Sequence, residues 1–192
     1  LRECIVSNLQ IKPLHLPGLC HIKRDNLDDS RGFLSRLFCM TELAAAGWVD
    51  PIQQVNYTHS AKRGTVRGMH FQRFPNAEMK MVTCIKGEIF DVAVDIRPSS
   101  PTFLQWHGEI LSSKNKSSLI IPQGFAHGFQ TLVDDCELIY FHSESYSPFS
   151  ESGVAFNDPS LNITWPNKVI EVSARDKSHK LIDMNFQGAE LI

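Results

Sequence analysis

Three side chains in the sequence have the types and settings that proton chemistry needs. His70 lies between Gly64 and Gln72, Lys80 follows eight residues after that glutamine, and His127 lies further along the chain. An imidazole, with an ordinary pKa near 6.5, takes up a proton readily at neutral pH. An ammonium stabilises the oxyanion that forms when a carbon next to a ketone loses its proton. A second group on the opposite face could return that proton with inverted stereochemistry, so these residues suit an epimerase, although their spacing alone does not select one.

The segments around His70 and His127 resemble the two signature motifs of the cupin β-barrel, which hold a metal ion in many cupins. In that pattern a second histidine and a glutamate complete the ligand set, but Gln72 and Lys80 occupy their positions here. An ammonium has no lone pair to donate and repels a divalent cation. Two imidazoles are too few for a tight site. We therefore expect no metal and no cofactor, which makes a metal-dependent cupin oxygenase the weakest alternative.

Length and composition favour a single globular domain. The chain has 192 residues, of which 42% are hydrophobic, and a formal net charge of −2. No apolar run approaches the ~20 residues of a membrane helix, and duplex nucleic-acid binders usually carry a basic surplus. We expect no membrane and no nucleic-acid partner. We predict one domain over residues 1–192, with a barrel core over about 53–147 and a C-terminal segment, 148–192, packing across it.

The cysteines indicate a reducing compartment. Their number is odd, no C-x-x-C pair occurs, and the chain is long for a disulfide framework; they are Cys4, Cys20, Cys39, Cys84 and Cys136. The first ten residues lack the charged-then-apolar pattern of a signal peptide. We expect free thiols and a cytoplasmic protein.

Strand signals dominate the middle of the chain. Polar and apolar residues alternate with period two over 87–96, which is typical of a pleated strand with one more polar face. Lys86-Gly87 before it resembles a hairpin turn joining it to the strand at 80–85. Short strands follow through 117–141. This pattern predicts a mainly β fold, either a barrel or a sandwich.

The N-terminal part holds the clearest helix signal. Residues 40–48 are rich in alanine, with Thr41 as a candidate N-cap and Gly47 as a stop. The preceding polar stretch, 24–31, is predicted to be a loop.

Several long motifs, in order and near the expected spacing, resemble the dTDP-4-dehydrorhamnose 3,5-epimerase family over about residues 28–176. They are R-G-F at 31–33, V-R-G-M-H-F-Q at 66–72, K-G-E-I-F-D-V-A-V-D-I-R at 86–97, S-P-T-F-x-x-W at 100–106, I-P-Q-G-F-A-H-G-F at 121–129, N-D-P-S-L-N-I-T-W-P at 157–166 and V-S-A-R-D at 172–176. The resemblance implies a cupin-type double-stranded β-helix (jelly-roll) barrel with a few short helices, normally a homodimer. It also implies cofactor-independent epimerisation at C3 and C5 of a dTDP-4-keto-6-deoxyhexose.

The same resemblance assigns catalytic roles. His70 falls at the base that removes the proton alpha to the C4 ketone, and Asp176 at its carboxylate partner. Tyr140 falls at the general acid on the other face, with Tyr146 as the fallback. Lys80 falls beside the C4 oxygen.

Substrate-binding positions follow in the same way. The residues implied are His127 beside the sugar, Arg67 and Arg175 for the nucleotide sugar, Arg31 reaching over from the neighbouring subunit, and Gln54, Asn56 and Glu151 as further contacts. One departure is marked: the family pattern R-G-F-F-x-E ends on a glutamate, whereas Arg36 stands here. It bears on the orientation of the sugar and on which carbons are epimerised.

Strict strand alternation would place Arg67 and His70 on opposite faces. Gly68 between them is a candidate bulge that would bring both to one face. The remaining histidines are interpreted as surface or packing residues; they are His15, His21, His59, His107, His142 and His179.

Three alternatives stay open from the sequence. The first is an epimerase acting at C3 or C5 alone, and the second an epimerase of another nucleotide-linked 4-keto sugar. The third is a cupin that binds a sugar nucleotide without catalysis, for which an intact His70–Asp176–Tyr140 set would have no purpose.

Overall fold

The computed structural model describes residues 8–190 as a β structure with two short helices and one 3-10 turn. The strands are β1 (Leu9–Pro13), β2 (Cys20–Arg24), β3 (Asn26–Asp29), β4 (Gly32–Ser35), β5 (Gln54–Ser60), β6 (Thr65–Gln72), β7 (Lys80–Lys86), β8 (Glu88–Asp95), β9 (Trp106–Ser112), β10 (Ser117–Ile121), β11 (Phe125–Thr131), β12 (Cys136–His142), β13 (Glu151–Gly153) and β14 (Glu171–Val172). The helices are α1 (Met40–Leu43) and α2 (Ala174–Lys177), and η1 (Ala44–Ala46) is the 3-10 turn.

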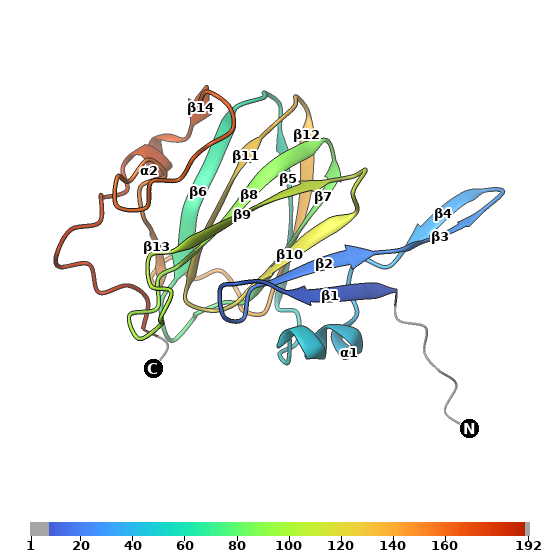
Figure 1. Cartoon of the computed structure of the whole chain (residues 1–192), viewed down its shortest axis with the longest axis horizontal. Coiled ribbons are helices and arrows are strands. Elements are labelled where there is room, and N and C mark those ends of the chain that lie inside the picture. The colour runs from blue at the N-terminus through green and yellow to red at the C-terminus, as the bar shows by residue number, and fades with distance from the viewer. Residues whose placement is uncertain (1–7, 191–192) are drawn as a thin grey trace.

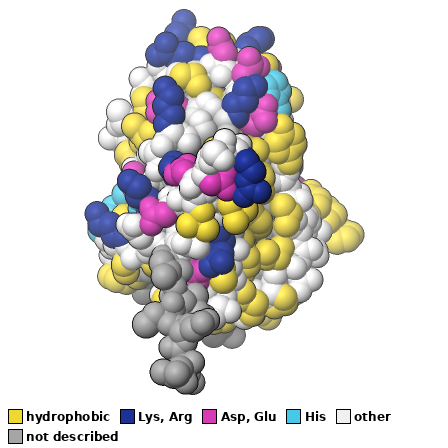
Figure 2. All heavy atoms as spheres, turned by 90° about the vertical axis from the view of Figure 1, so that its right-hand side faces the viewer, with side chains coloured by type: hydrophobic (Ala, Val, Ile, Leu, Met, Phe, Trp, Pro, Cys, Tyr) yellow, Lys and Arg dark blue, Asp and Glu magenta, His cyan; other side chains and the backbone are white. Residues whose placement is uncertain are grey.

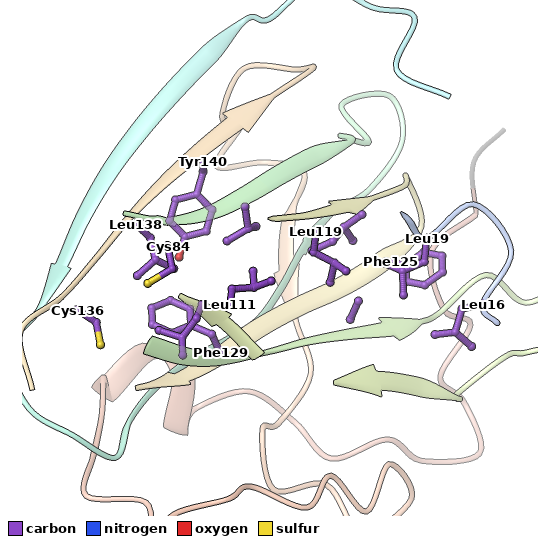
Figure 3. Packing of buried hydrophobic residues seen from close by; sticks show 14 residues of the cluster. Leu16, Leu19, Cys84, Leu111, Leu119, Phe125, Phe129, Cys136, Leu138 and Tyr140 are labelled. Carbon is purple, nitrogen blue, oxygen red and sulfur yellow. The ribbon is translucent and has the colours of Figure 1, made fainter. Parts of the chain in front are cut away.

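Two sheets, each built mainly from antiparallel strand pairs, face each other (Figure 1). One has the order β1-β2-β10-β7-β12-β5 and the other β13-β6-β11-β8-β9, with β14 pairing β6 in parallel. Because most neighbouring strands are distant in sequence, with β1–β2 and β8–β9 the consecutive pairs, this is the jelly-roll arrangement that the family resemblance implies. A cluster of buried side chains from both sheets, including Leu119, Phe129 and Leu138, fills the space between them (Figure 3).

The connection at Lys86-Gly87 is a corner between the sheets, so the predicted hairpin is wrong. β7 pairs with β10 and β12, whereas β8 pairs with β11 and β9. Gly87 has φ +80°, and a Cβ there would lie 2.8 Å from the Cys136 sulfur. The same turn chemistry serves a hairpin and a sheet-to-sheet corner, which is why the residues alone did not distinguish them.

Both faces of β8 are buried, one between the two sheets and the other under the C-terminal segment. Ile89 and Ala93 belong to the cluster between the sheets, and Asp91 lies on the same face, so the more polar face is the interior one. Val92 and Val94, on the outer face, pack with residues of the C-terminal segment. Those residues include Leu161, Ile163, Trp165, Ile182, Phe186 and Ala189. A sheet with two apolar faces needs this second layer.

The N-terminal part differs from its prediction in two places. Residues 26–29 pair with 32–35 as an antiparallel arm that projects from the barrel, so the stretch predicted as a loop is largely strand (Figure 1). The helix begins after Cys39, which makes no side-chain cap, so Thr41 is not the N-cap. The predicted end is confirmed, because Gly47 closes the 3-10 turn in the left-handed region at φ 84°.

Within the part of the chain that the structure describes, four cysteines carry free thiols: Cys20, Cys39, Cys84 and Cys136. Cys4 lies outside the described residues. No described helix is long and apolar enough to cross a membrane.

Candidate active site

A cavity of about 290 Å³ lies among the strands of the two sheets and takes in nine of the eleven predicted site residues. Its lining is Gln54, Asn56, Thr58, Arg67, His70, Glu78, Lys80, His127, Phe129, Tyr140, His142, Tyr146, Glu151 and Arg175. Of the remaining two, Asp176 lies behind His70, and Arg31 lies on the β3–β4 arm.

The two sheets supply different chemistry to this cavity. His70 on β6 and His127 on β11 are direct cross-strand partners in one sheet. In the other sheet, Tyr140 on β12 pairs with Asn56 on β5, and His142 pairs with Lys80 on β7. His70 and His127 therefore come from one wall, and the Tyr140 phenol, the Lys80 ammonium and the His142 imidazole from the other.

Gly68 provides the bulge that the site requires. His127 pairs with His70 and Phe129 with Arg67, so three steps along β6 oppose two along β11. The extra residue brings both Arg67 and His70 to the cavity, as the bulge hypothesis predicts. Gly68 has φ +128°, and a Cβ there would lie 2.5 Å from the Gly128 Cα, so glycine is required on both counts.

His70 and Asp176 form a hydrogen-bonded pair. His70 Nε2 lies 2.8 Å from Asp176 Oδ1, and the Gly68 amide donates to Oδ2 at 3.1 Å. Burial would raise the pKa of Asp176, but the contacts with His70, Gly68 and Ser173 outweigh it and hold that pKa well below its usual range. The carboxylate is ionised and accepts the Nε2 proton, which leaves the lone pair of His70 on Nδ1.

The sequence places Asp176 by way of a short helix. Ser173 caps α2, its hydroxyl accepting the Asp176 amide at 3.0 Å. The helix leaves the Asp176 side chain buried and the Arg175 side chain half exposed at the cavity mouth.

A second network borders the mouth of the cavity. Arg175 pairs with Glu151 at 2.7 Å, and the Tyr146 hydroxyl donates to the other oxygen of Glu151 at 2.7 Å. Arg175 Nη2 also lies 3.1 Å from His70 Nε2; since Nε2 gives its proton to the closer Asp176 carboxylate at 2.8 Å, this approach is a contact between two donors and not a hydrogen bond. Glu151 and Arg175 therefore form an ion pair that lines the cavity next to His70.

Tyr140 and Tyr146 differ in environment. Tyr140 is buried in the inter-sheet cluster beside Leu138 and Cys84 (Figure 3). Its burial, and secondarily the Asp91 charge, raises its pKa far above the ordinary value. Tyr146 is exposed, and its hydrogen bond to Glu151 raises its pKa.

A buried carboxylate fixes the orientation of the His127 ring. Its Nε2 lies 2.8 Å from Asp91 Oδ1, and Asp91 is fully buried. His127 also makes an edge contact with the Tyr140 ring at 6.0 Å between centroids. The Asp91 contact orients the ring, leaving Nδ1 for other partners.

Glu78 and His142 are cavity residues that the sequence analysis missed. Glu78 pairs with Lys80 at 2.7 Å and with His142 Nδ1 at 2.7 Å. His142, interpreted from the sequence as a surface or packing residue, is buried against the Tyr140 ring and also lines the cavity. Two signals were available: Glu78 lies two residues before Lys80, the spacing of one strand face, and His142 lies two after Tyr140.

One group of described residues has the geometry of metal ligands. Atoms of His70, Asp176 and His179 lie within 4.8 Å of one another. Arg175 approaches the same atoms, at 3.1 Å from His70 and 3.6 Å from Asp176, and its positive charge opposes a second cation there. The expectation that the site needs no metal stays a prediction.

The two N-terminal arginines lie outside the lining of the chain's own cavity. Arg31 is exposed on the arm and pairs with Asp29 at 2.6 Å. Arg36 pairs with Glu42, whose carboxylate also accepts the amides of Asn8 and Leu9. Arg36, the residue after β4, thus ties the end of the arm to α1.

Comparisons with known proteins identify relatives of this chain. Residues 13–183 match the family described as dTDP-4-dehydrorhamnose 3,5-epimerase. The chain is 50% identical over 131 residues to the dTDP-4-dehydrorhamnose 3,5-epimerase of Salmonella typhimurium, covering 68% of this chain and 71% of the relative. It is 35% identical over 175 residues to the dTDP-4-dehydrorhamnose 3-epimerase of Streptomyces niveus, covering 91% and 84%. Among solved structures, a 3,5-epimerase from Legionella pneumophila in complex with dTDP-4-keto-L-rhamnose superposes with a TM-score of 0.87 at 36% identity, covering 95% of this chain and 98% of that one.

Proposed function

Because the chain belongs to the dTDP-4-dehydrorhamnose 3,5-epimerase family, we propose that it inverts C3 and C5 of a dTDP-linked 4-keto-6-deoxyhexose without a cofactor. One observation carries the proposal. His70 lies on one sheet wall of the cavity with Asp176 behind it, Tyr140 comes from the other wall, and Lys80 lines the same space. A base and an acid on facing walls are what inversion by proton transfer requires.

His70 is the proposed base. Both C3 and C5 lie next to the C4 ketone, so loss of a proton from either gives an enolate whose charge rests on the C4 oxygen. The Nδ1 lone pair takes the proton, and the resulting imidazolium is stabilised by Asp176 at 2.8 Å. Proton transfer of this type contributes roughly 10²–10⁴-fold in rate.

Lys80 and Tyr140 complete the step. The Lys80 ammonium stabilises the enolate oxygen by a charge-assisted hydrogen bond. Tyr140 then delivers a proton to the carbon from the face opposite His70. Its raised pKa keeps the hydroxyl protonated until a strongly basic carbon faces it.

The remaining polar side chains bind the substrate in this proposal. Arg67 and Arg175 hold the diphosphate through bidentate, charge-assisted contacts. The sugar contacts are assigned to His127, Gln54, Asn56 and Glu151, all of which line the cavity.

A second copy of the chain completes the site in this proposal. Arg31 lies on an arm that projects away from its own barrel, which supports contact with the partner's cavity in a homodimer. We propose one domain per chain, and a cytoplasmic location, which the free thiols favour.

A single-carbon epimerase is the second candidate, because one relative over 91% of the chain is a 3-epimerase. Proton exchange separates the two. The protein is incubated with dTDP-4-keto-6-deoxyglucose in D2O and the sugar is followed by NMR. We expect deuterium at both C3 and C5; deuterium at one carbon supports the narrower activity. Nucleotide binding without exchange at either carbon would contradict catalysis on this sugar.

A further inference from the structure

Lys80 shares the cavity wall with a buried acid and a buried histidine that the mechanism above does not use. Its Nζ lies 2.7 Å from Glu78 Oε1, and Glu78 Oε2 lies 2.7 Å from His142 Nδ1. The three side chains are 6%, 10% and 11% exposed, respectively. Buried charges at such distances are strongly coupled.

Backbone hydrogen bonds and strand pairing hold Glu78 close to both Lys80 and His142. Glu78 precedes β7 by two residues, and the next residue, Met79, makes two hydrogen bonds with Ser143, the residue after β12. Its amide donates to the Ser143 hydroxyl at 2.9 Å, and its carbonyl accepts the Ser143 amide at 2.9 Å. His142 is the cross-strand partner of Lys80. The Glu78 carboxylate is thereby held between the side chains of two paired residues.

Hydrogen-bond directions fix the state of His142. Asn56 Nδ2 lies 3.3 Å from His142 Nε2, and an amide nitrogen can only donate. Nε2 therefore carries the lone pair, and Nδ1–H donates to Glu78. Neutral His142 with its proton on Nδ1 satisfies both contacts.

The hydrogen bonds between the cavity mouth and His142 all have the same donor-to-acceptor order. Gln54 Nε2 donates to Asn56 Oδ1 at 2.9 Å, and the Tyr146 amide donates to Gln54 Oε1 at 2.9 Å. Each group thus accepts from one neighbour and donates to the next. This series of hydrogen bonds ends at Glu78, which accepts from His142 on one carboxylate oxygen and from Lys80 on the other.

Glu78 is ionised in this setting. Burial would raise its pKa, but the Lys80 ammonium and the His142 contacts outweigh burial and lower the pKa to about 2. Among the described residues, Glu78 is the partner that the structure gives Lys80 Nζ. An ammonium has three donors, so two stay available for a ligand oxygen.

We propose that Glu78 and His142 are positioning residues for Lys80. Glu78 fixes the ammonium where negative charge develops on the C4 oxygen, and His142, through Nδ1–H, fixes Glu78. This inference rests on the proposed function, since it names the oxyanion as the group that Lys80 serves.

Kinetics of four variants test the proposal. Glu78→Ala frees the Lys80 side chain and should lower kcat roughly 10²-fold with little change in KM, because the oxyanion contact is made in the transition state. Glu78→Gln keeps an acceptor for Lys80 and should lose less. His142→Ala should lower kcat roughly 10-fold, a loss expected for an ammonium displaced by under 1 Å. His142→Asn, which retains an amide donor for Glu78, should recover most of it.

Glu109→Gln is the matched control, because Glu109 pairs with His107 at 3.2 Å on β9, outside the cavity lining. It should leave kcat and KM unchanged. A Glu78→Ala enzyme with wild-type kcat, or with an effect confined to KM, would overturn the proposal while leaving the epimerase function standing.

A second readout needs no turnover. In ¹⁵N-labelled protein, the Lys80 ammonium signal is assigned by its disappearance in Lys80→Arg. We expect the signal in the wild type and in Glu109→Gln, and its loss or a large shift in Glu78→Ala. An unchanged Lys80 signal in Glu78→Ala would show that Glu78 does not hold the ammonium, whatever the enzyme's substrate.

Discussion

The charge state of Asp176 determines how His70 can act. Its carboxylate is buried, yet it accepts from both the His70 ring and the Gly68 amide, and these bonds keep it ionised. An ionised partner at 2.8 Å selects the tautomer with the lone pair on Nδ1 and stabilises the imidazolium that proton abstraction creates.

Asp176→Asn should therefore lower kcat by roughly 10²–10⁴-fold. The amide keeps the shape but no longer stabilises imidazolium, and it favours the wrong tautomer. Steady-state kinetics with the 4-keto sugar nucleotide measure the loss, and Asp183→Asn, at an exposed position of the same C-terminal segment, is the control. Activity within a factor of about two of the wild type would exclude the pair from catalysis.

For the individual site residues, the resemblance of the sequence motifs predicted most of the positions. The structure brings His70, Asp176, Tyr140 and Lys80 around one region, as expected. Glu78 was missed because its partner on β12 lies 64 residues away, and strand pairing is not readable from one sequence.

Among the strands that form the cavity, β6 has the most tightly constrained backbone. Its bulge at Gly68 presses the backbone against β11, with the Gly68 Cβ position 2.8 Å from the His127 carbonyl. That approach brings His70 and Arg67 to the same cavity.

Gly68→Ala should destabilise the fold by about 2–5 kcal/mol, combining a positive φ with a backbone clash. Gly32→Ala is the matched control, because φ is +132° there and a Cβ would meet nothing within 4 Å. It should lose about 1–2 kcal/mol from the positive φ alone. Urea unfolding of the three proteins measures both, and equal losses in the two variants would argue against the close approach of β6 and β11.

Local sequence patterns predicted where strands occur better than they predicted which strands pair. The alternation over 87–96 correctly predicts β8, but it does not show that β7 and β8 belong to different sheets. The polar stretch 26–29 forms a strand because 32–35 pairs with it, a context that propensity does not include.

For the whole molecule, the exposed apolar residues lie where the proposed dimer needs them. On the arm, Leu27, Phe33 and Leu34 are 53%, 67% and 69% exposed. Val55 and Tyr57 are exposed on β5, an edge strand. Figure 2 shows the face from which the arm projects, with hydrophobic side chains gathered along one side. A monomer seldom exposes so many large apolar side chains on one short arm.

We therefore predict a dimer with twice the 21.7 kDa mass of one chain by light scattering. Phe33→Ser with Leu34→Ser should yield a monomer, because it removes apolar area from the interface. Arg31→Ala should leave the dimer intact and raise KM. A wild-type protein that stays monomeric at micromolar concentration would contradict the dimer proposal.

In the proposed mechanism, His70 and Tyr140 act on opposite faces of the same carbon. The most direct test compares deuterium exchange with inversion in Tyr140→Phe, in D2O and by NMR. His70 can still remove a proton and return a deuteron from its own face, so we predict exchange with retained configuration and little inverted product. His70→Asn should show neither exchange nor inversion. Normal inversion in Tyr140→Phe would contradict the assignment of Tyr140 as the acid, and exchange at the wild-type rate in His70→Asn would contradict the assignment of His70 as the base.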